Sequence, residues 1–358
     1  MTSCRLLSQH CNSLSYDSNF INLHCQRTNT IAGYFLQTLH HDDHYSTFVS
    51  VDNSSSGLTL DFLPCPVKDI EIVACSDGGL ILCKNTLTWR GKYYICKPSS
   101  KQFETIPNPI HVLTKNVIGI GLMVLGLNPL RFKVVRIFEP YNHDEEKQDL
   151  FKYEVFDSEI WEWNPPKDLF LPFSLLPKKS RGLSVYGGLH WLTMSEKNTL
   201  SFFEDYWVLV PLPESKTEDA LFSSVRTRLT KYEGKLGVIY EKSERSGIEM
   251  VELWIMKQDC NGKGVWSKKH QLNFEACNNE QQNRDCSVLC FYNPDIVLMT
   301  GFGFVIFYNF KTGRFKRVEL DSIYKYAEDA VFVHTDVEPI IFNLKAQVTD
   351  YEPIKSIN

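Results

Sequence analysis

The sequence predicts an all-β fold, a β-propeller with about six blades. The main observation is a pattern that recurs about every 50 residues: a β-type apolar run, a tight polar turn and a second run with an aromatic residue. β-Branched and aromatic residues, bounded by Gly, Pro, Asn, Asp and Ser, dominate the chain after residue 30. Repeats of this length built from short strands are typical of propeller blades, so we expect a protein that binds other molecules.

Five copies of the repeat can be followed along the chain. They cover residues 93–103, 153–161, 200–207, 251–266 and 305–315. The aromatic residues that follow the turns are expected to pack between neighbouring blades, because each of them buries a large apolar area.

The elements are expected in the following order. Residues 1–27 favour a short helix or two, residues 28–340 form one propeller domain, and residues 341–358 form a C-terminal tail. The blades are expected at residues 30–75, 76–112, 117–165, 180–213, 225–272 and 285–320. A strand near Ala330–Thr335 is placed to close the ring against the first blade, since closure removes exposed sheet edges.

Glycines mark four hairpin turns, at residues 186–188, 232–235, 261–264 and 311–314. Glycine adopts the positive φ angles that tight hairpins need. After residue 30 the only helical signal is a turn around Asp321–Ala327.

The composition excludes several classes of partner. The formal charge of the 358 residues is −5 and no basic run stands out, which argues against nucleic acid. No apolar run approaches the roughly 20 residues of a membrane span, and the first residues do not resemble a secretory signal. We therefore expect a protein of the cytoplasm, the nucleus or both, with no nucleic acid and no membrane as partner.

The eleven cysteines indicate buried free thiols. Their number is odd, their positions are scattered, and no Cys-x-x-Cys pair occurs. Cys277, Cys286 and Cys290 are not at metal-ligand spacing and are expected in the core.

The densest group of potential metal ligands is the run His-His-Asp-Asp-His at residues 40–44. Adjacent strand residues point to opposite faces, so a solvated loop is favoured over a metal site. The Gly-x-Gly pairs at 119–121 and 301–303 complete no phosphate loop, and no Gly-x-Ser-x-Gly elbow occurs. We expect no metal, no cofactor and no catalytic residue.

The recognition surface of a propeller lies on the loops around its channel. The longest polar candidates are residues 142–148, 243–247 and 278–284, and the sequence does not decide among them. The seven tryptophans are expected in the blade core, with Trp161 and Trp163 on one face of a strand.

The motifs resemble those of the plant F-box proteins that carry an F-box-associated, kelch-like interaction domain. Cys4-Arg5-Leu6-Leu7-Ser8, Asn12-Ser13-Leu14 and Asp17-Ser18-Asn19-Phe20 with Leu23-His24 are similar to the closing third of an F-box. The downstream similarities are at residues 75–83, 94–103, 131–136 and 185–192, the last reading Val-Tyr-Gly-Gly-Leu-His-Trp-Leu. They cover nearly the whole chain in the order of the family.

The resemblance implies the substrate-recognition subunit of a Skp–cullin–F-box ubiquitin ligase, which binds a protein target through its β domain and catalyses nothing. In such a ligase the remaining F-box helix would contact the Skp adaptor through Leu6, Leu7 and Leu14. The opening of the F-box and the tryptophan of its last helix are absent, and Cys11 stands in the place of that tryptophan. The alternative is therefore a stand-alone propeller binding module. A propeller enzyme would instead need metal ligands or carboxylates that converge on the channel mouth.

Overall fold

The structure is a computed structural model and describes residues 32–41, 43–50, 57–76, 79–87, 92–109, 114–127, 129–140, 150–178, 181–204, 206–214, 224–244, 247–258, 264–274, 286–320 and 329–334. The expected F-box segment 1–27, the tail 341–358, residues 261–263 of the predicted turn 261–264 and the helical turn 321–327 lie outside these residues.

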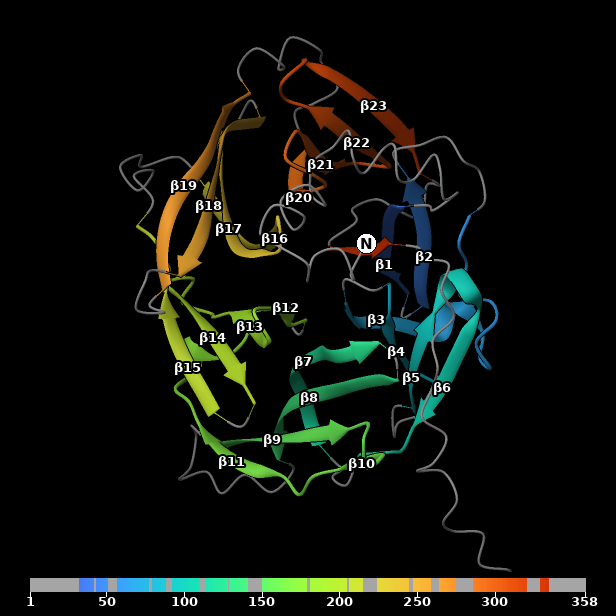
Figure 1. Ribbon diagram of the computed structural model, residues 1–358. Helices are drawn as coiled ribbons and strands as arrows, with labels where there is room; N and C mark the ends of the chain where they lie inside the picture. Colours follow the sequence, from blue (N-terminus) through green and yellow to red (C-terminus); the bar gives the residue numbers. More distant parts are fainter. Residues whose placement is uncertain are drawn as a thin grey trace, which may run out of the picture.

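Six β-sheets form a ring around a central axis (Figure 1). Five of them have four or five strands, and the sixth has three strands. The described residues contain no α-helix, and their helical turns are the short 3-10 helices η1 (Val67–Asp69), η2 (Pro98–Ser100) and η3 (Phe173–Leu175). The predicted all-β propeller is confirmed.

The first three blades follow the chain closely. The first sheet holds β1 (Ala32–His40), β2 (Asp43–Ser50) and β24 (Asp329–His334). The second holds β3 (Ile70–Cys75), β4 (Ile81–Asn85), β5 (Lys92–Lys97) and β6 (Gln102–Ile106). The third holds β7 (Thr114–Leu127), β8 (Leu130–Pro140), β9 (Leu150–Asp157), β10 (Glu162–Trp163) and β11 (Lys167–Phe170).

The last three blades are four-stranded antiparallel meanders. The fourth holds β12 (Leu183–Val185), β13 (Gly188–Leu192), β14 (Asn198–Phe203) and β15 (Tyr206–Pro211). The fifth holds β16 (Ser224–Tyr232), β17 (Lys235–Glu244), β18 (Gly247–Gln258) and β19 (Gly264–Asn273). The sixth holds β20 (Ser287–Phe291), β21 (Ile296–Gly301), β22 (Phe304–Asn309) and β23 (Arg314–Glu319).

The ring closes where the sequence predicts. β24 pairs antiparallel with β1, from Ala32 opposite His334 to Gln37 opposite Asp329. A strand from the end of the chain therefore completes the sheet that the start of the chain opens. Closure of this kind holds the two ends of a propeller together and removes an exposed edge.

The predicted boundary between the first two blades was wrong. Residues 70–75 form β3, which pairs with β4 in the second blade, with Cys75 opposite Ile81. The turn signal around residues 76–80 joins two strands of one blade, and Ser76 N–H donates to Leu80 O there. A glycine-rich turn is needed both inside a blade and between blades, so the turn residues alone do not distinguish the two.

Two of the predicted hairpin turns have both central residues at positive φ. Glu233 and Gly234 have φ of 49° and 72°, and Tyr232 is opposite Lys235. Tyr186 and Gly187 have φ of 53° and 69°. This is the type I′ geometry, whose twist matches that of the flanking strands.

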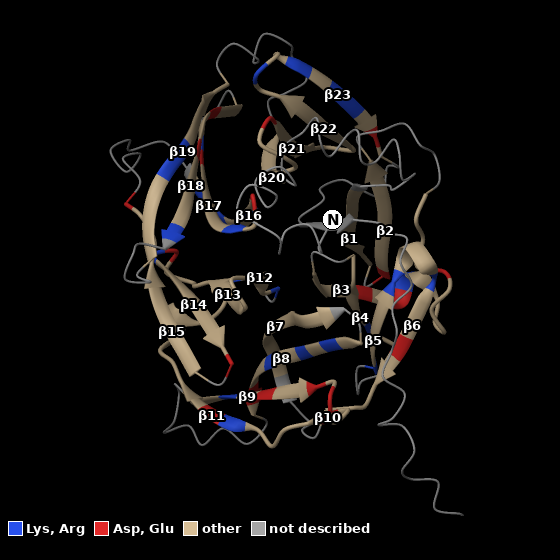
Figure 2. Ribbon diagram, in the orientation of Figure 1, with Lys and Arg blue, Asp and Glu red and all other residues tan. Residues whose placement is uncertain are grey.

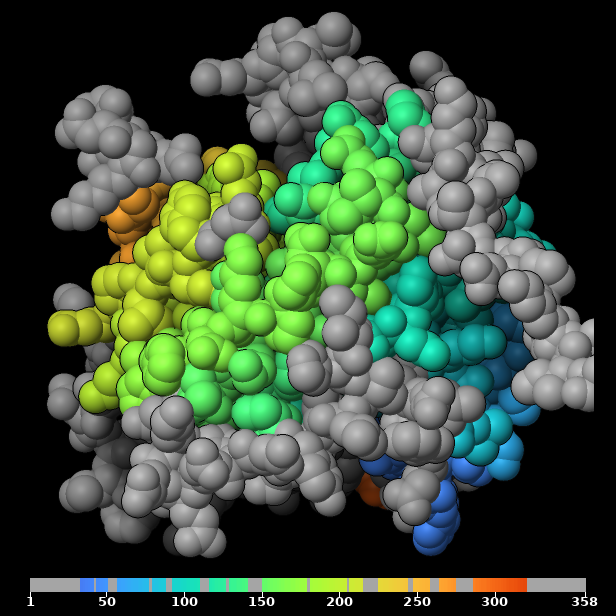
Figure 3. All heavy atoms as spheres, turned by 90° about the horizontal axis from the view of Figure 1, so that it is seen from below, coloured from blue at the N-terminus to red at the C-terminus, as the bar shows by residue number. Residues whose placement is uncertain are grey.

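One hydrophobic cluster lies between each pair of neighbouring blades. Phe156 and Leu82 belong to the cluster between the second and third blades, and Trp191 and Tyr153 to the cluster between the third and fourth. The other four clusters join the remaining neighbours in the same way. Figure 3 shows the third blade (green) packed against the second (teal) and the fourth (yellow-green). The predicted packing of aromatic residues between blades is confirmed for Trp161, Trp207 and Trp266, whereas Phe315 of the last repeat is 56% exposed.

The predicted strand face shared by Trp161 and Trp163 was wrong. Trp161 has φ of 58° and precedes β10, so the two residues do not belong to one regular strand. Both rings nevertheless reach the cluster between the second and third blades, where the Trp161 ring lies 5.3 Å from that of Phe156. The turn, and not strand alternation, brings them together.

His190 is fully buried in the fourth blade, beside Trp191. Its Nδ1 accepts a hydrogen bond from Ser201 Oγ at 2.8 Å, and its Nε2–H donates to the Val185 carbonyl at 3.1 Å. The carbonyl can only accept, which places the proton of the neutral ring on Nε2. Burial lowers the pKa of His190 to about 4.

The stability of the protein is expected to fall as the pH falls from 6.5 to 4, because in this range His190 takes up a proton only in the unfolded chain. With a pKa of about 4 in the folded protein, the free energy of unfolding at pH 4 is expected to be about 3 kcal/mol lower than above pH 6.5. The measurement is urea unfolding at several pH values, for the wild-type chain and for His190→Gln. Carboxylates titrate in the same range in both proteins, so equal pH slopes would contradict the assignment to His190.

Candidate functional site

The innermost strands of the blades contact one another around the axis. Contacts join β3 to β7 and β24, β12 to β7 and β16, and β20 to β16 and β24. β12 also contacts β3, although these strands belong to the fourth and second blades. Ile120 in β7 forms a parallel bridge with Arg181, and Gly182 N–H donates to Ile120 O at 2.7 Å. The innermost strands therefore lie close together near their starting ends.

Polar side chains on or beside the first residues of these strands form two networks, one around Gln37 and one around Glu241. We call the two networks together the channel-end group, defined as Gln37, Glu71, Lys84, Arg181, Arg226, Arg228, Glu241 and Ser287. Figure 2 shows charged residues on the ribbons of β3 and β16 beside the central axis. The group combines cations, carboxylates and neutral hydrogen-bonding groups.

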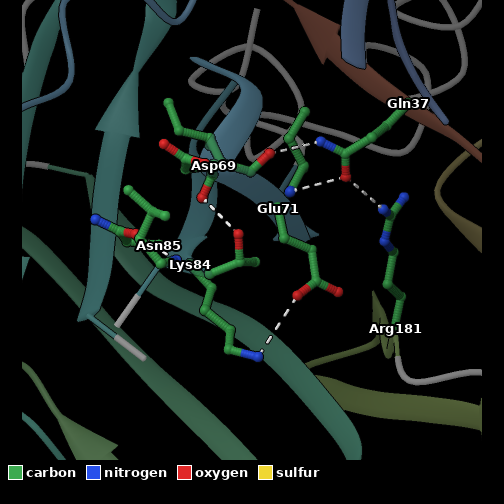
Figure 4. A network of polar contacts seen from close by, with 10 residues as sticks. Gln37, Asp69, Glu71, Lys84, Asn85 and Arg181 are labelled. Carbon is green, nitrogen blue, oxygen red and sulfur yellow. Dashed lines mark hydrogen bonds and ion pairs between the residues drawn. The ribbon is translucent and has the colours of Figure 1, made fainter. Parts of the chain in front are cut away.

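Gln37 is the centre of the first half of this group (Figure 4). Its Nε2–H atoms donate to Ile70 O at 2.9 Å and to Ser46 Oγ at 2.8 Å. Its Oε1 accepts from Ile72 N–H at 3.0 Å and from Arg181 Nη2–H at 3.2 Å. The amide thereby satisfies both donors and both lone pairs, and it connects β1, β3 and the start of β12.

Arg181 has spare hydrogen-bonding capacity. Nη2 donates to Gln37, whereas Nη1 is buried and has no hydrogen-bond partner within the part of the chain that the structure describes. Beside it, Glu71 and Lys84 lie directly opposite each other and form an ion pair at 3.6 Å (Figure 4). Because Nη1 is buried, the guanidinium would have to rotate before it could donate to an acceptor oxygen from another molecule.

His44 lies near this end of the channel, and its pKa is lowered. Burial is the main cause, and the positive charge of Arg181 acts in the same direction, while Glu71 acts against it. A neutral imidazole can donate one hydrogen bond and accept another, so His44 adds neutral polar character to this region.

Glu241 is the centre of the second half of the channel-end group. This buried carboxylate on β17 accepts from Val288 N–H at 2.6 Å and from Ser287 Oγ at 3.0 Å. Arg226 Nη1 lies 3.7 Å from Glu241 Oε1, and Arg228 Nη2 donates to Ser287 Oγ at 3.4 Å. Glu241 therefore joins the fifth blade to the sixth and holds two arginines at the start of β16.

Two buried thiols among the described residues have raised pKa values. Burial raises the pKa of the Cys290 thiol to about 12, and the pKa of Cys83 is raised by its contact with Cys96, 3.9 Å away, and by burial. Thiols of this kind stay protonated and react slowly. Among the described residues no group of three or more His, Cys, Asp and Glu side chains could hold a metal ion.

Most of the residues singled out by sequence lie elsewhere. Leu6, Leu7, Leu14 and the polar loops 142–148 and 278–284 are outside the described residues. The rings of His40 and His41 meet edge to face with centroids 4.1 Å apart at the tip of the β1–β2 hairpin, and Asp43 pairs with Lys68 at 3.5 Å. Cys286 and Cys290 pack in the blade core, as predicted, and Cys277 is outside the described residues.

Sequence reasoning missed Gln37, Arg181 and Glu241. Gln37 and Glu241 each follow an apolar run, Tyr-Phe-Leu and Val-Ile-Tyr. A buried polar side chain is costly unless it has partners, so a lone polar residue in such a run could have drawn attention. Arg181 carries no such signal.

No helix among the described residues has the length and apolar character needed to cross a membrane.

Comparison with known proteins identifies the family. The profile of the F-box associated beta propeller domain matches residues 25–342, which is most of the chain. The chain belongs to this family. Its members include F-box proteins, which are generally non-catalytic adaptors.

Two F-box proteins of Arabidopsis thaliana are similar in sequence. F-box protein At5g41720 is 36% identical over 154 residues, which cover 39% of this chain and 79% of the relative. F-box protein At5g49610 is 27% identical over 179 residues, which cover 47% of this chain and 48% of the relative. The chain thus spans about half the length of the second relative.

Solved structures are similar at low sequence identity. TolB from Acinetobacter baumannii has a TM-score of 0.46 and 11% identity, over 88% of this chain and 70% of TolB. An acylaminoacyl peptidase from Pyrococcus horikoshii has a TM-score of 0.41 and 9% identity, over 82% of this chain and 53% of the peptidase.

Proposed function

We propose that this F-box associated propeller is the substrate-recognition subunit of a Skp–cullin–F-box ubiquitin ligase and binds a protein target. The observation that carries the proposal is membership of the F-box associated propeller family over residues 25–342. The similarity of residues 4–24 to the closing third of an F-box supports it independently. The alternative is a propeller binding module that is not coupled to ubiquitin.

The mechanism is proximity. The receptor holds its target next to the enzyme that carries ubiquitin, which raises the effective concentration of the reacting groups. The receptor itself makes and breaks no bond. The channel-end group offers hydrogen bonds and charge for such a contact.

Within this proposal the target docks on the channel-end group. A buried N–H without an acceptor costs about 1–3 kcal/mol, and Arg181 Nη1 is in this situation among the described residues. Rotation of the guanidinium toward an acceptor oxygen of a bound target would recover that free energy. Hydrogen bonds from a guanidinium to a carboxylate or carbonyl are also directional, so they contribute specificity.

Adaptor binding tests the ligase role. The full chain is expected to retain purified Skp adaptor in a pull-down, and replacing Leu6, Leu7 and Leu14 by aspartate is expected to weaken retention at least about tenfold, because charges would disrupt an apolar helix contact. Leu39→Asp, at an exposed leucine of β1, is the control and should retain the adaptor. A folded wild-type chain that does not retain the adaptor would leave the stand-alone binding module as the function.

Target binding is tested separately at Arg181. Arg181→Met is expected to lose the proteins that co-purify with the wild-type chain while it still retains the adaptor, which serves as the internal standard. Arg181→Lys keeps the charge but not the paired N–H groups and should show a partial loss. An unchanged set of co-purified proteins with Arg181→Met would place the docking site elsewhere.

A further inference from the structure

The outer edge of the fourth blade is unusual in composition. β15 pairs with β14 on one side and is the last strand of its sheet among the described residues. Its sequence, Tyr-Trp-Val-Leu-Val-Pro, has no charged residue, and its ribbon in Figure 2 is uniformly tan. Tyr206, Val208 and Leu209 are 57%, 36% and 40% exposed.

The other outermost strands carry charge. Charged residues on them include Asp43 on β2, Glu104 on β6, Lys167 on β11, Lys268 on β19 and Arg314 on β23. Charges on edge strands protect proteins against pairing with other chains. Five edges of this propeller have that protection, and the edge at β15 does not.

The pairing of β15 with β14 shows which main-chain N–H and C=O groups of β15 point away from the sheet. Leu212 N–H donates to Lys197 O, and Thr199 Oγ1 contacts Val210 O, so residues 208, 210 and 212 direct their main-chain groups toward β14. Because these directions alternate along a strand, Trp207, Leu209 and Pro211 direct theirs outward. Pro211 has no N–H, and its carbonyl accepts from Trp266 Nε1–H at 2.8 Å. The N–H and C=O groups of Trp207 and Leu209 therefore form a short row at an apolar edge.

We propose that β15 binds an extended, uncharged segment of a partner protein, which adds a strand to the fourth blade. The alternating N–H and C=O groups of Trp207 and Leu209 match the main chain of an extended segment and no other backbone conformation. Tyr206 and Val208 lie on one face of the strand and Trp207 and Leu209 on the other, so the added strand meets apolar side chains on both faces. A charged segment would lose hydration there without gaining an ion pair on β15.

The small number of outward main-chain groups on β15 favours a peptide over a second copy of this chain as the bound partner. A stable dimer buries about 1,200–2,000 Å² in total, whereas this edge offers the main-chain groups of two residues and three exposed apolar side chains. A single flexible segment needs no larger surface, because strand addition takes its affinity from main-chain hydrogen bonds. This binding does not depend on the ligase role or on the channel-end group.

In the experiment, a displayed library of random peptides of about twelve residues is selected for binding to the full wild-type chain. Peptides that also bind the Leu209→Pro variant are removed by counter-selection. The proline removes the outward N–H of residue 209 and leaves the ladder with β14 intact, so the variant should fold. Enriched peptides are expected to be apolar in their central residues and to bind Leu209→Pro at least about tenfold more weakly. Leu209→Ala keeps the N–H and is the matched control, with a smaller loss.

A second measurement does not depend on the folding of the variant. N-methylation of a selected peptide, one residue at a time, should abolish binding to the wild-type chain at every second residue only, because alternate N–H groups face the edge. The proposal is overturned if no peptide is enriched, if the enriched peptides bind Leu209→Pro equally, or if N-methylation shows no alternation. It is also overturned if sedimentation shows a wild-type dimer that Leu209→Pro dissociates, because the occupant would then be a second copy.

Discussion

Replacement of Arg136 by methionine is expected to lower the free energy of unfolding by about 3–5 kcal/mol. Arg136 on β8 lies directly opposite Glu154 on β9, with Nη1 2.6 Å from Oε1. Their side chains are 4% and 0% exposed. The substitution would leave a carboxylate charge buried without its cation, and the guanidinium would no longer lie over the Phe138 ring, 4.9 Å away. Urea unfolding of the purified variant gives the measurement.

The double variant Arg136→Met, Glu154→Met is expected to be much closer to the wild-type chain. Two apolar side chains of similar volume need no desolvation of charge, so removal of both partners can be neutral or even stabilising. A double variant as unstable as Arg136→Met would show that the pair is held by packing that methionine cannot reproduce. The same measurement on the wild-type chain, Arg136→Met, Glu154→Met and the double variant gives the coupling free energy directly.

Replacement of Trp191 by alanine is expected to cost about 3–5 kcal/mol, because it opens a cavity between the third and fourth blades. Trp191 is fully buried, and its ring lies against two glycines. A Cβ built on Gly182 would lie 2.6 Å from the ring, and one built on Gly121 would lie 3.1 Å from it. The glycine backbone lines this side of the space that the Trp191 ring occupies. No side chain on this side can therefore rotate into the cavity that alanine leaves.

Phe315→Ala is the matched control for this prediction. Phe315 is also an aromatic residue of a strand, but it lies on β23 and is 56% exposed. Its replacement is expected to change the free energy of unfolding by less than about 0.5 kcal/mol. Equal losses for the two variants, measured by urea unfolding, would contradict the role assigned to the ring between the blades.

The local patterns of the sequence predicted the fold class well. Strand alternation and glycine turns depend on neighbouring residues only, and the turns at 186–188 and 232–235 have Gly187 and Gly234 at positive φ, which glycine favours. The boundary between the first two blades was missed for the same reason. The turn around residues 76–80 has the composition of any turn, and only the pairing of β3 with β4 shows that it lies inside one blade.

The candidate site could not be predicted in this way. Gln37 and Arg181 are 144 residues apart in the sequence and come within 3.2 Å across the channel. Gln37 has only the local signal of a polar residue after an apolar run, and Arg181 has none, because their roles depend on groups that the closed ring brings to them. The apolar edge at β15 is a similar case, since its apolar residues read like those of any other strand until the sheet order places it outermost.

The sequence by itself determined the class of fold, the repeated strands, the tight turns and the closing strand, together with the resemblance to the F-box associated propeller family that the family profile confirms. These features follow from residue spacing along a single stretch of chain. The tertiary structure decided which strands share a blade, which polar residues meet at the channel and which edge is left without charge. Those features depend on contacts between distant residues, which form only when all the sheets close into one ring.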